Sequence, residues 1–268
     1  MIGVFDSGVG GLTVLKALLR ELPAERFVYL GDTARLPYGT KSAATVARYA
    51  QQAAEALGRY ELKCLVVACN TASAVGLPAV RARLEAVPVI GVIEPGAEAA
   101  CAASPSGRIA VIGTEGTVRG GAYQQAIQRR RAQAEVYALP APLFVALAEE
   151  GLGEGPIAEA VARHYLAALF APRSAAPVPD TLVLGCTHFP MLLGAIRAAV
   201  GPAVRIVDSA ETTARHVRAA LEAAGLASRH GPGGLRLLAT DAPERFARIG
   251  AHFLERPIGA HEVELIDL

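Results

Sequence analysis

The chain has 268 residues and a formal net charge of +1, with 52% hydrophobic and 19% charged residues. This composition is typical of a folded protein with a large core and excludes a mainly disordered chain. The near-zero net charge gives no reason to expect nucleic acid or a membrane surface as a partner.

The cysteines indicate a reduced compartment. There are four, Cys64, Cys69, Cys101 and Cys186, which are too few and too scattered for a disulfide framework. The first residues contain no basic segment leading into an apolar run, so no secretory signal is expected. No apolar run is long enough to span a bilayer. We therefore expect a cytoplasmic protein whose thiols are free for chemistry.

Short apolar runs alternate with helical patterns from the first residues onward. Ser42 is a plausible N-cap for the second helix. Up to residue 103 we expect strands at 2–5, 27–30, 65–68 and 87–92, and helices at 12–22, 42–57, 72–84 (interrupted near Gly76 and Pro78) and 97–103.

The same alternation continues to the end of the chain. Residues 113–117 are expected to form a polar turn, residues 171–179 a surface loop, and Asp241 the N-cap of the last helix. We expect strands at 108–112, 135–138, 182–185, 204–207, 235–239 and 263–266, and helices at 122–131, 143–150, 157–169, 191–200, 209–221 and 243–254.

Strands that alternate with helices predict an α/β fold with mainly parallel sheets. The second half of the chain resembles the first, which indicates two pseudo-symmetric lobes, each a mainly parallel sheet flanked by helices, with the active site in the cleft between them. Crossovers are expected at Glu94-Pro95 and Asp208-Ser209. The predicted lobes are residues 1–94 with 209–268, and residues 95–208.

Two cysteines occupy equivalent places in the two halves. Leu-Val-Val-Ala leads into Cys69-Asn70-Thr71, and Leu-Val-Leu-Gly leads into Cys186-Thr187-His188. Ligands of open α/β sheets bind at the carboxyl ends of strands. We therefore expect Cys69 and Cys186 to face each other across one cleft. Asn70 is the only asparagine in the chain.

Three other interpretations of these cysteines remain open. Free cysteine is often an inert core residue, which suits Cys64 and Cys101 better than the two strand tips. Cys69, Cys186 and His188 could hold zinc, although no short Cys-x-x-Cys spacing is present. A disulfide between them is disfavoured in a reducing compartment.

The glycine-rich turn at 6–13 follows a strand and opens a helix, as in dinucleotide-binding folds, and Asp32 lies where the ribose-binding acid would be. However, Thr13 replaces the third glycine, and Asp6 would place a carboxylate beside a pyrophosphate. The alternative is that backbone N–H groups meet a small carboxylate ligand, with Asp6 facing its amine or α-hydrogen.

A pair of thiols suits a reaction that inverts an amino acid. The α-hydrogen must be removed on one face and replaced on the other, and the reverse reaction exchanges the two roles. A free thiol has a pKa of about 8.5, so a thiolate at pH 7 costs about 2 kcal/mol. A helix N-terminus after each strand would offset part of that cost. Asp6 and His188 could relay protons.

Six motifs together resemble glutamate racemase, of the aspartate/glutamate racemase family, and they occur in order over nearly the whole chain. They are Phe5-Asp6-Ser7-Gly8-Val9-Gly10-Gly11-Leu12, Tyr29–Thr33 with Pro37-Tyr38-Gly39, Ala68-Cys69-Asn70-Thr71-Ala72-Ser73, Gly91-Val92-Ile93-Glu94-Pro95-Gly96, Gly185-Cys186-Thr187-His188-Phe189-Pro190 and Asp208-Ser209-Ala210-Glu211.

The resemblance implies a cofactor-independent, metal-free racemase that interconverts L- and D-glutamate with two thiols and supplies D-glutamate for peptidoglycan. It implies a homodimer, as is common in the family. Cys69 and Cys186 correspond to the two bases, and Asp6 and His188 to assisting groups. The implied substrate contacts are Asp6, Ser7, Pro37, Tyr38, Gly39, Cys69, Asn70, Thr71, Thr114, Thr117, Cys186, Thr187 and His188.

A further assisting acid in the family follows a Pro-Leu-Phe segment, which makes it Glu149 or Glu150 here, with Glu149 preferred. The family often has Cys-Pro where this chain has Ala141-Pro142. Alternatives to the glutamate interpretation are a two-cysteine racemase acting on another amino acid, such as aspartate, and a catalytically silent binding protein on the same fold.

Overall fold

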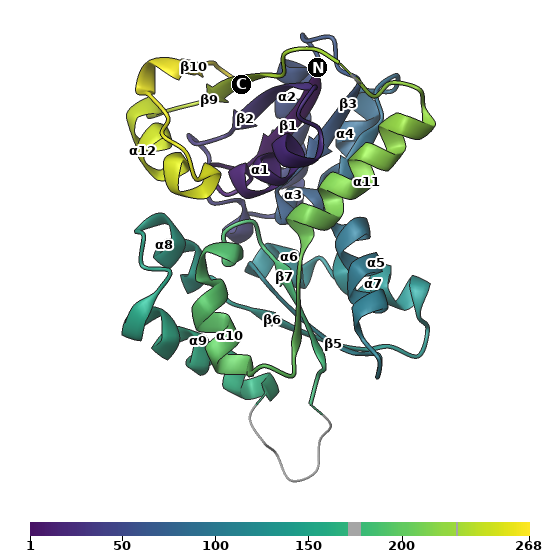
Figure 1. The fold of residues 1–268 in the computed structure, drawn as a ribbon, viewed down its shortest axis with the longest axis vertical. Helices are drawn as coiled ribbons and strands as arrows, with labels where there is room; N and C mark the ends of the chain where they lie inside the picture. Colours follow the sequence, from purple (N-terminus) through teal and green to yellow (C-terminus); the bar gives the residue numbers. More distant parts are fainter. Residues whose placement is uncertain (171–177, 229) are drawn as a thin grey trace.

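The computed structural model describes residues 1–170, 178–228 and 230–268 (Figure 1). Most of the surface loop predicted at 171–179 lies outside these residues. The chain forms two lobes, each built on its own sheet, and every strand pair found in the described residues is parallel. The predicted two-lobe α/β fold is therefore confirmed.

The first lobe, in the upper half of Figure 1, contains a six-stranded sheet of order β10-β9-β2-β1-β3-β4. The C-terminal segment returns to this lobe, because β9 pairs with β2 and β10 with β9. The strands are β1 (Ile2–Asp6), β2 (Arg26–Gly31), β3 (Cys64–Val67), β4 (Val89–Gly91), β9 (Gly234–Ala239) and β10 (Val263–Leu265).

The second lobe contains a four-stranded sheet of order β6-β5-β7-β8. Its two central strands, β5 and β7, are almost entirely buried, as expected of parallel strands covered on both faces. The strands are β5 (Arg108–Gly113), β6 (Glu135–Pro140), β7 (Thr181–Gly185) and β8 (Arg205–Asp208).

Helices flank both sheets (Figure 1). The α-helices are α1 (Leu12–Glu21), α2 (Ala43–Leu57), α3 (Asn70–Val75), α4 (Leu77–Arg83), α5 (Ile93–Ala103), α6 (Glu115–Arg119), α7 (Ala122–Arg130), α8 (Leu143–Glu149), α9 (Gly155–Phe170), α10 (Leu193–Val200), α11 (Ser209–Ala223) and α12 (Pro243–Leu254), and the short 3₁₀ helices are η1 (Tyr38–Thr40), η2 (Phe189–Leu192) and η3 (Ala260–Glu262).

Apolar spacing explains why these helices pack as they do. Leu12, Leu15 and Leu18 recur at helical spacing on α1 and are fully buried against the first sheet. Burial of a leucine side chain contributes about 1.5–3 kcal/mol. The chain passes between the sheets twice, through α5 and through α11, and these two helices pack on each other. The lobe boundaries predicted at 94/95 and 208/209 stay a prediction.

Three local predictions are wrong. Asp241 does not cap α12; its carboxylate accepts from the Ala242 N–H, and Ala242 itself is the N-cap in a left-handed conformation. Residues 113–117 are not only a turn, because α6 begins at Glu115 with the Thr114 hydroxyl as its cap. The helix expected at 191–200 is divided into η2 and α10.

Candidate active site

Cys69 lies directly beyond β3 and is the N-cap of α3. Its sulfur accepts from the Ala72 N–H at 3.4 Å, and its thiol donates to the Ser7 hydroxyl at 3.6 Å. The helix N-terminus predicted after this strand is thus present at Cys69. The cysteine side chain is fixed on both sides and is only 5% exposed.

Cys186 lies directly beyond β7, the equivalent place in the second lobe. No helix of regular α geometry starts at this cysteine, so the predicted helix N-terminus beside it is absent. The His188 ring lies beside this cysteine instead, with its Nδ1 at 3.9 Å from the Cys186 sulfur. The two thiols therefore have different surroundings.

Both cysteines line one small pocket of about 40 Å³ between the lobes. The sequence prediction that they share a cleft is confirmed by this geometry. The full lining is Ser7, Gly8, Leu36, Pro37, Tyr38, Gly39, Cys69, Asn70, Thr71, Thr114, Val145, Glu149, Cys186, Thr187 and His188.

Asp6 and Thr117 are the predicted site residues that do not line this pocket. Asp6 is fully buried at the end of β1, and its Oδ2 accepts from the Gly8 N–H at 2.9 Å. Its Oδ1 has no hydrogen-bond partner among the described residues. Burial raises the pKa of Asp6, and the nearby positive charge of His188 offsets only part of the effect.

Burial and the neighbouring Asp6 carboxylate raise the pKa of Cys69 to about 12. The Ala72 N–H at the start of α3 acts in the opposite direction but does not compensate. The sequence-based expectation that this helix N-terminus favours a thiolate is therefore outweighed by burial. In the ligand-free protein at neutral pH, Cys69 is a protonated thiol.

His188 joins Cys186 to a carboxylate. Its Nε2 lies 3.1 Å from Glu149 Oε1, and Arg245 donates to the other oxygen of Glu149 at 3.0 Å. Burial lowers the pKa of His188, but Cys186 and Glu149 outweigh burial and raise it to about 10. Burial likewise raises the pKa of Glu149, and His188 and Arg245 bring it below its usual range. Glu150 is exposed, so the geometry favours Glu149 as the assisting acid.

Three hydroxyls meet where the lobes join. Thr71 Oγ1 lies 2.9 Å from Thr114 Oγ1 and 3.1 Å from Thr117 Oγ1, and the last two are also 3.1 Å apart. Thr71 belongs to the first lobe and the other two to the second. Thr117 thus supports the pocket through Thr71 and Thr114 without lining it.

Close backbone approach needs glycine at two positions. A Cβ at Gly10 would clash with the His188 ring and the Thr187 hydroxyl, and a Cβ at Gly39 would clash with Thr114. The glycine-rich turn after β1 therefore lets the histidine of the other lobe pack directly on it. This turn therefore has a packing role that its sequence pattern does not indicate.

Asp32, which fits the ribose-binding position of a dinucleotide motif, has another role. It is fully buried, accepts from the Tyr38 hydroxyl, and binds Arg35 Nε at 2.7 and 3.0 Å. Thr240 donates to its Oδ1 at 3.0 Å. Asp32 therefore holds the segment that carries Pro37, Tyr38 and Gly39 against the pocket.

Three residues that line the pocket were not predicted from the sequence. Gly8, Leu36 and Val145 line the pocket. Leu36 directly precedes a predicted contact, and Val145 lies between Phe144 and Glu149, so each was within reach of a motif already noted. Arg245, on α12, carried no signal because its contact with Glu149 joins residues 96 positions apart.

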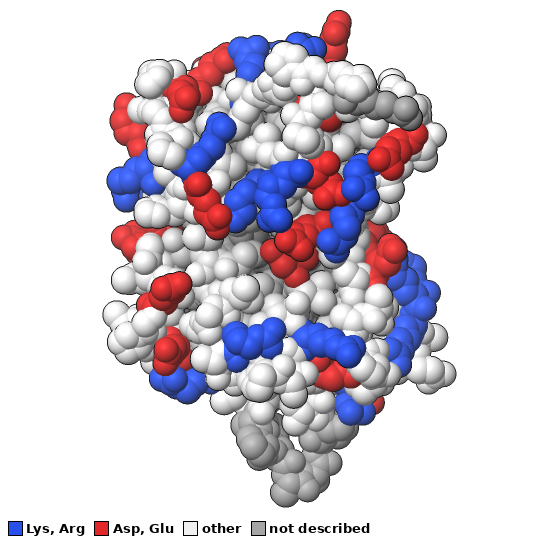
Figure 2. Space-filling model, viewed as in Figure 1, with Lys and Arg blue, Asp and Glu red and all other residues white. Residues whose placement is uncertain are grey.

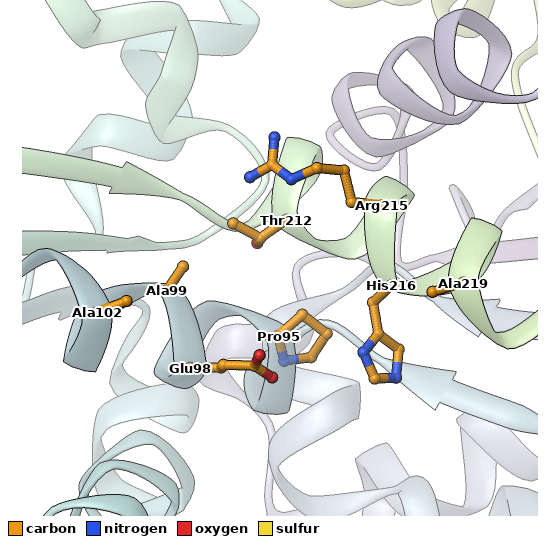
Figure 3. A pocket seen from close by; sticks show the side chains of 8 residues that line it. All are labelled: Pro95, Glu98, Ala99, Ala102, Thr212, Arg215, His216 and Ala219. Carbon is orange, nitrogen blue, oxygen red and sulfur yellow. The ribbon is translucent and has the colours of Figure 1, made fainter.

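A larger hollow of about 360 Å³ lies elsewhere, in the groove between α5 and α11 (Figure 3). Glu98 and His216 flank it from the two helices, and alanines line much of the rest. It contains neither cysteine. On the face shown in Figure 2, positive and negative side chains are interspersed, in line with the small net charge.

Within residues 1–170, 178–228 and 230–268, no group of three or more His, Cys, Asp and Glu side chains is placed to hold a metal ion. Among the same residues, no helix has both the length and the apolar character needed to cross a bilayer.

Comparison with known proteins identifies the family. A family model described as Asp/Glu/Hydantoin racemase matches residues 2–217. The chain belongs to this racemase family. It is therefore an isomerase by family, and the two-cysteine pocket is the candidate active site of a racemase.

Relatives within the family are similar over nearly their full length. The glutamate racemase of Geobacter metallireducens is 50% identical, with 96% of this chain and 94% of the relative covered. The structure of glutamate racemase from Thermus thermophilus with beta-chloro-D-alanine has a TM-score of 0.87 and 47% identity, covering 100% of this chain and 96% of the other. That of Francisella tularensis with D-glutamate has a TM-score of 0.91 and 36% identity, covering 99% and 97%.

Proposed function

We propose that the protein interconverts L- and D-glutamate without a cofactor, with Cys69 and Cys186 as the two acid/base groups. One observation carries the proposal: both thiols line the same small pocket, each at the carboxyl end of a strand from a different sheet. The 50% identity to a glutamate racemase and the likeness to a racemase solved with D-glutamate support the choice of substrate.

The reaction needs a base on one face of the α-carbon and an acid on the other. Cys69, with a pKa of about 12, carries the proton in the resting protein. A positively charged imidazole stabilises negative charge on a sulfur beside it, and His188 supplies that charge next to Cys186. Cys186 then removes the α-hydrogen of one enantiomer while Cys69 delivers a proton to the opposite face. The other enantiomer reacts with these roles exchanged.

The assisting groups act on one thiol each. Asp6 lies close enough to Cys69 to raise its pKa, which supports a part for Asp6 in proton movement on that side. His188 and Glu149 form the corresponding pair at Cys186. Contact of Asp6 with the substrate itself remains a prediction.

Polar but uncharged groups are proposed to hold the substrate's carboxylates. The pocket lining contains no lysine or arginine. Asn70, Thr71, Thr114 and Thr187 offer amide and hydroxyl groups, and neutral donors of this kind hold a carboxylate without adding positive charge beside Cys69.

Three further parts of the proposal concern the cell and the assembly. D-glutamate would serve peptidoglycan synthesis, the protein would act in the cytoplasm, and two copies would form a homodimer. Light scattering on the purified protein tests the last part, since a dimer of 27.8 kDa chains has twice the mass of one chain. A monomer under assay conditions would contradict it.

The decisive assay follows optical activity with L- and D-glutamate, and with both aspartate enantiomers, without added cofactor. We expect glutamate to racemise in both directions. Cys69→Ser and Cys186→Ser should each lose at least about 10²-fold in rate, the usual range for removing an acid/base group. Cys101→Ser is the matched control and should retain activity, because Cys101 lies on α5 outside the pocket.

The outcomes of this assay separate the alternatives. Turnover of aspartate in place of glutamate would keep the two-thiol chemistry and change the substrate. Full activity in either pocket variant would rule out the two-thiol scheme. No racemisation of any amino acid would favour a silent binding protein.

A further inference from the structure

The side-chain amide of Asn70 is bound at one end only. Asn70 lines the pocket and is 3% exposed. Its Oδ1 accepts from the Tyr123 hydroxyl at 2.8 Å, whereas its buried Nδ2 has no partner among the described residues. A buried donor left without an acceptor destabilises the protein, because it has lost its hydrogen bonds to water. A ligand in the pocket would supply the missing acceptor.

Tyr123 reaches Asn70 across the junction between the lobes. It lies on α7, at the second sheet, and is 1% exposed. Two glycines leave just enough room for it. A Cβ at Gly96 would lie 3.1 Å from the phenol oxygen, and a Cβ at Gly185 would lie 3.1 Å from the ring. The phenol therefore has a fixed position relative to both Asn70 and the strand that leads to Cys186.

The phenol proton decides which end of the amide faces the pocket. Burial raises the pKa of Tyr123, so the hydroxyl keeps its proton. A buried hydroxyl needs an acceptor for that proton, and Oδ1 can accept it while Nδ2 cannot. If the amide were reversed, the phenol would lose the Oδ1 acceptor, Nδ2 would face the phenol oxygen, and the carbonyl oxygen would face the pocket.

We infer that Tyr123 is a positioning residue for substrate binding: it holds the Asn70 amide so that Nδ2 donates a hydrogen bond to a carboxylate of the substrate. This inference rests on the proposed function. A carboxylate accepts a hydrogen bond from an amide N–H. A reversed amide would instead direct its carbonyl oxygen at the carboxylate, and the two oxygens would repel each other. Tyr123 acts only through Asn70, because it does not line the pocket itself.

A double-mutant cycle tests the inference. The proteins are the wild type, Tyr123→Phe, Asn70→Ala and the double variant, with kcat and KM measured for both glutamate enantiomers. Tyr123→Phe keeps the ring and removes only the hydroxyl. We expect KM to rise about tenfold, which corresponds to about 1.4 kcal/mol, because the amide loses the bond that orients it towards the carboxylate, with a much smaller change in kcat. Adding Tyr123→Phe to Asn70→Ala should have almost no further effect.

Two controls accompany the cycle. Tyr137→Phe also removes one tyrosine hydroxyl, whose bond to Glu135 lies outside the pocket, and should leave KM unchanged. Thermal unfolding checks that each variant is folded. Calorimetric titration with D-glutamate repeats the cycle on binding alone, so the result does not depend on turnover.

The inference and the proposed function fail in different ways. If Tyr123→Phe raises KM equally in the wild type and in Asn70→Ala, Tyr123 does not act through Asn70 and the inference is wrong. An unchanged KM in Tyr123→Phe would also overturn it. If the wild type neither racemises nor binds glutamate, the proposed function fails and the inference fails with it.

Discussion

At the scale of single residues, the two thiols are chemically alike but electrostatically different. Cys69 lies beside a carboxylate and is buried, which keeps it protonated, whereas Cys186 lies beside a histidine with a raised pKa. A racemase needs one acid and one base at any moment, because two thiolates in one small pocket would repel each other. The surroundings of the two cysteines therefore differ in the way that the proposed two-thiol reaction needs.

Glu149 should matter far more than its neighbour in sequence. Glu149→Gln removes the charge that helps to hold His188 protonated, and we expect the racemisation rate to fall by about 10²-fold. Glu150→Gln is the matched control, because Glu150 is exposed and does not line the pocket. Steady-state rates at pH 8 make the comparison. Equal losses in both variants would show that Glu149 has no special role.

The raised pKa of His188 also predicts a pH-dependent stability. Since the folded-state pKa of about 10 exceeds the usual 6.5, the protonated histidine stabilises the fold fully below pH 6.5, and this stabilisation is lost as pH rises towards 10. The free energy of unfolding of the wild type should therefore exceed that of His188→Gln most at pH 6 and least at pH 10. Urea unfolding across this range measures it. A difference that grows with pH would contradict the assigned charge.

At the scale of elements, the strands and most helices could be predicted because apolar runs and helical spacing are local signals. Ser42 was recognised as a cap and does accept from the Thr45 N–H. α6 was missed because Thr114 begins a helix of only five residues, too short for a periodic pattern. Asp241 was misassigned because the left-handed backbone of Ala242 has no sequence signature.

The candidate site, like the fold, could be predicted where its signals are local in the sequence. The two cysteines could be placed together because each follows the carboxyl end of a strand in one of two similar sheets, and ligands of such sheets bind at that end. The motifs supplied most of the lining. The contacts of Tyr123 and Arg245 could not be foreseen, because each joins elements far apart in the chain whose packing is set by the whole fold. The role of Gly10 depends in the same way on the distant His188.

Two N-caps offer a matched pair of tests. Ser42→Ala and Thr114→Ala each remove a cap, and each should lower the free energy of unfolding by about 1 kcal/mol. Only Thr114 also lines the pocket, so only Thr114→Ala should raise KM for glutamate. Denaturant unfolding and steady-state kinetics on both variants check this. A similar KM for the two variants would remove Thr114 from the set of substrate contacts.

At the scale of the whole molecule, the pocket exists only because the two lobes meet. The hydroxyls of Thr71 and Thr114, the packing of Gly10 on His188 and the Tyr123–Asn70 bond each join one lobe to the other. A ligand bound between them stabilises the folded state by about 2.7 kcal/mol at 100 times its Kd.

D-glutamate should therefore raise the unfolding temperature of the wild type in proportion to the logarithm of its concentration. D-alanine, which lacks the side-chain carboxylate, should raise it much less. Calorimetric scans at increasing ligand concentrations measure the effect. Equal stabilisation by both amino acids would mean that the pocket does not recognise the second carboxylate.

We propose that two different thiols serve the two faces of the α-carbon. Racemisation of each glutamate enantiomer in deuterium oxide, followed over the first few per cent of reaction, tests it most directly. If two thiols act, the product should carry solvent deuterium at the α-carbon while the remaining substrate stays unlabelled. This should hold whichever enantiomer the reaction starts from. Product that retains the original hydrogen would show that one group both removes and returns the proton, and would contradict the account.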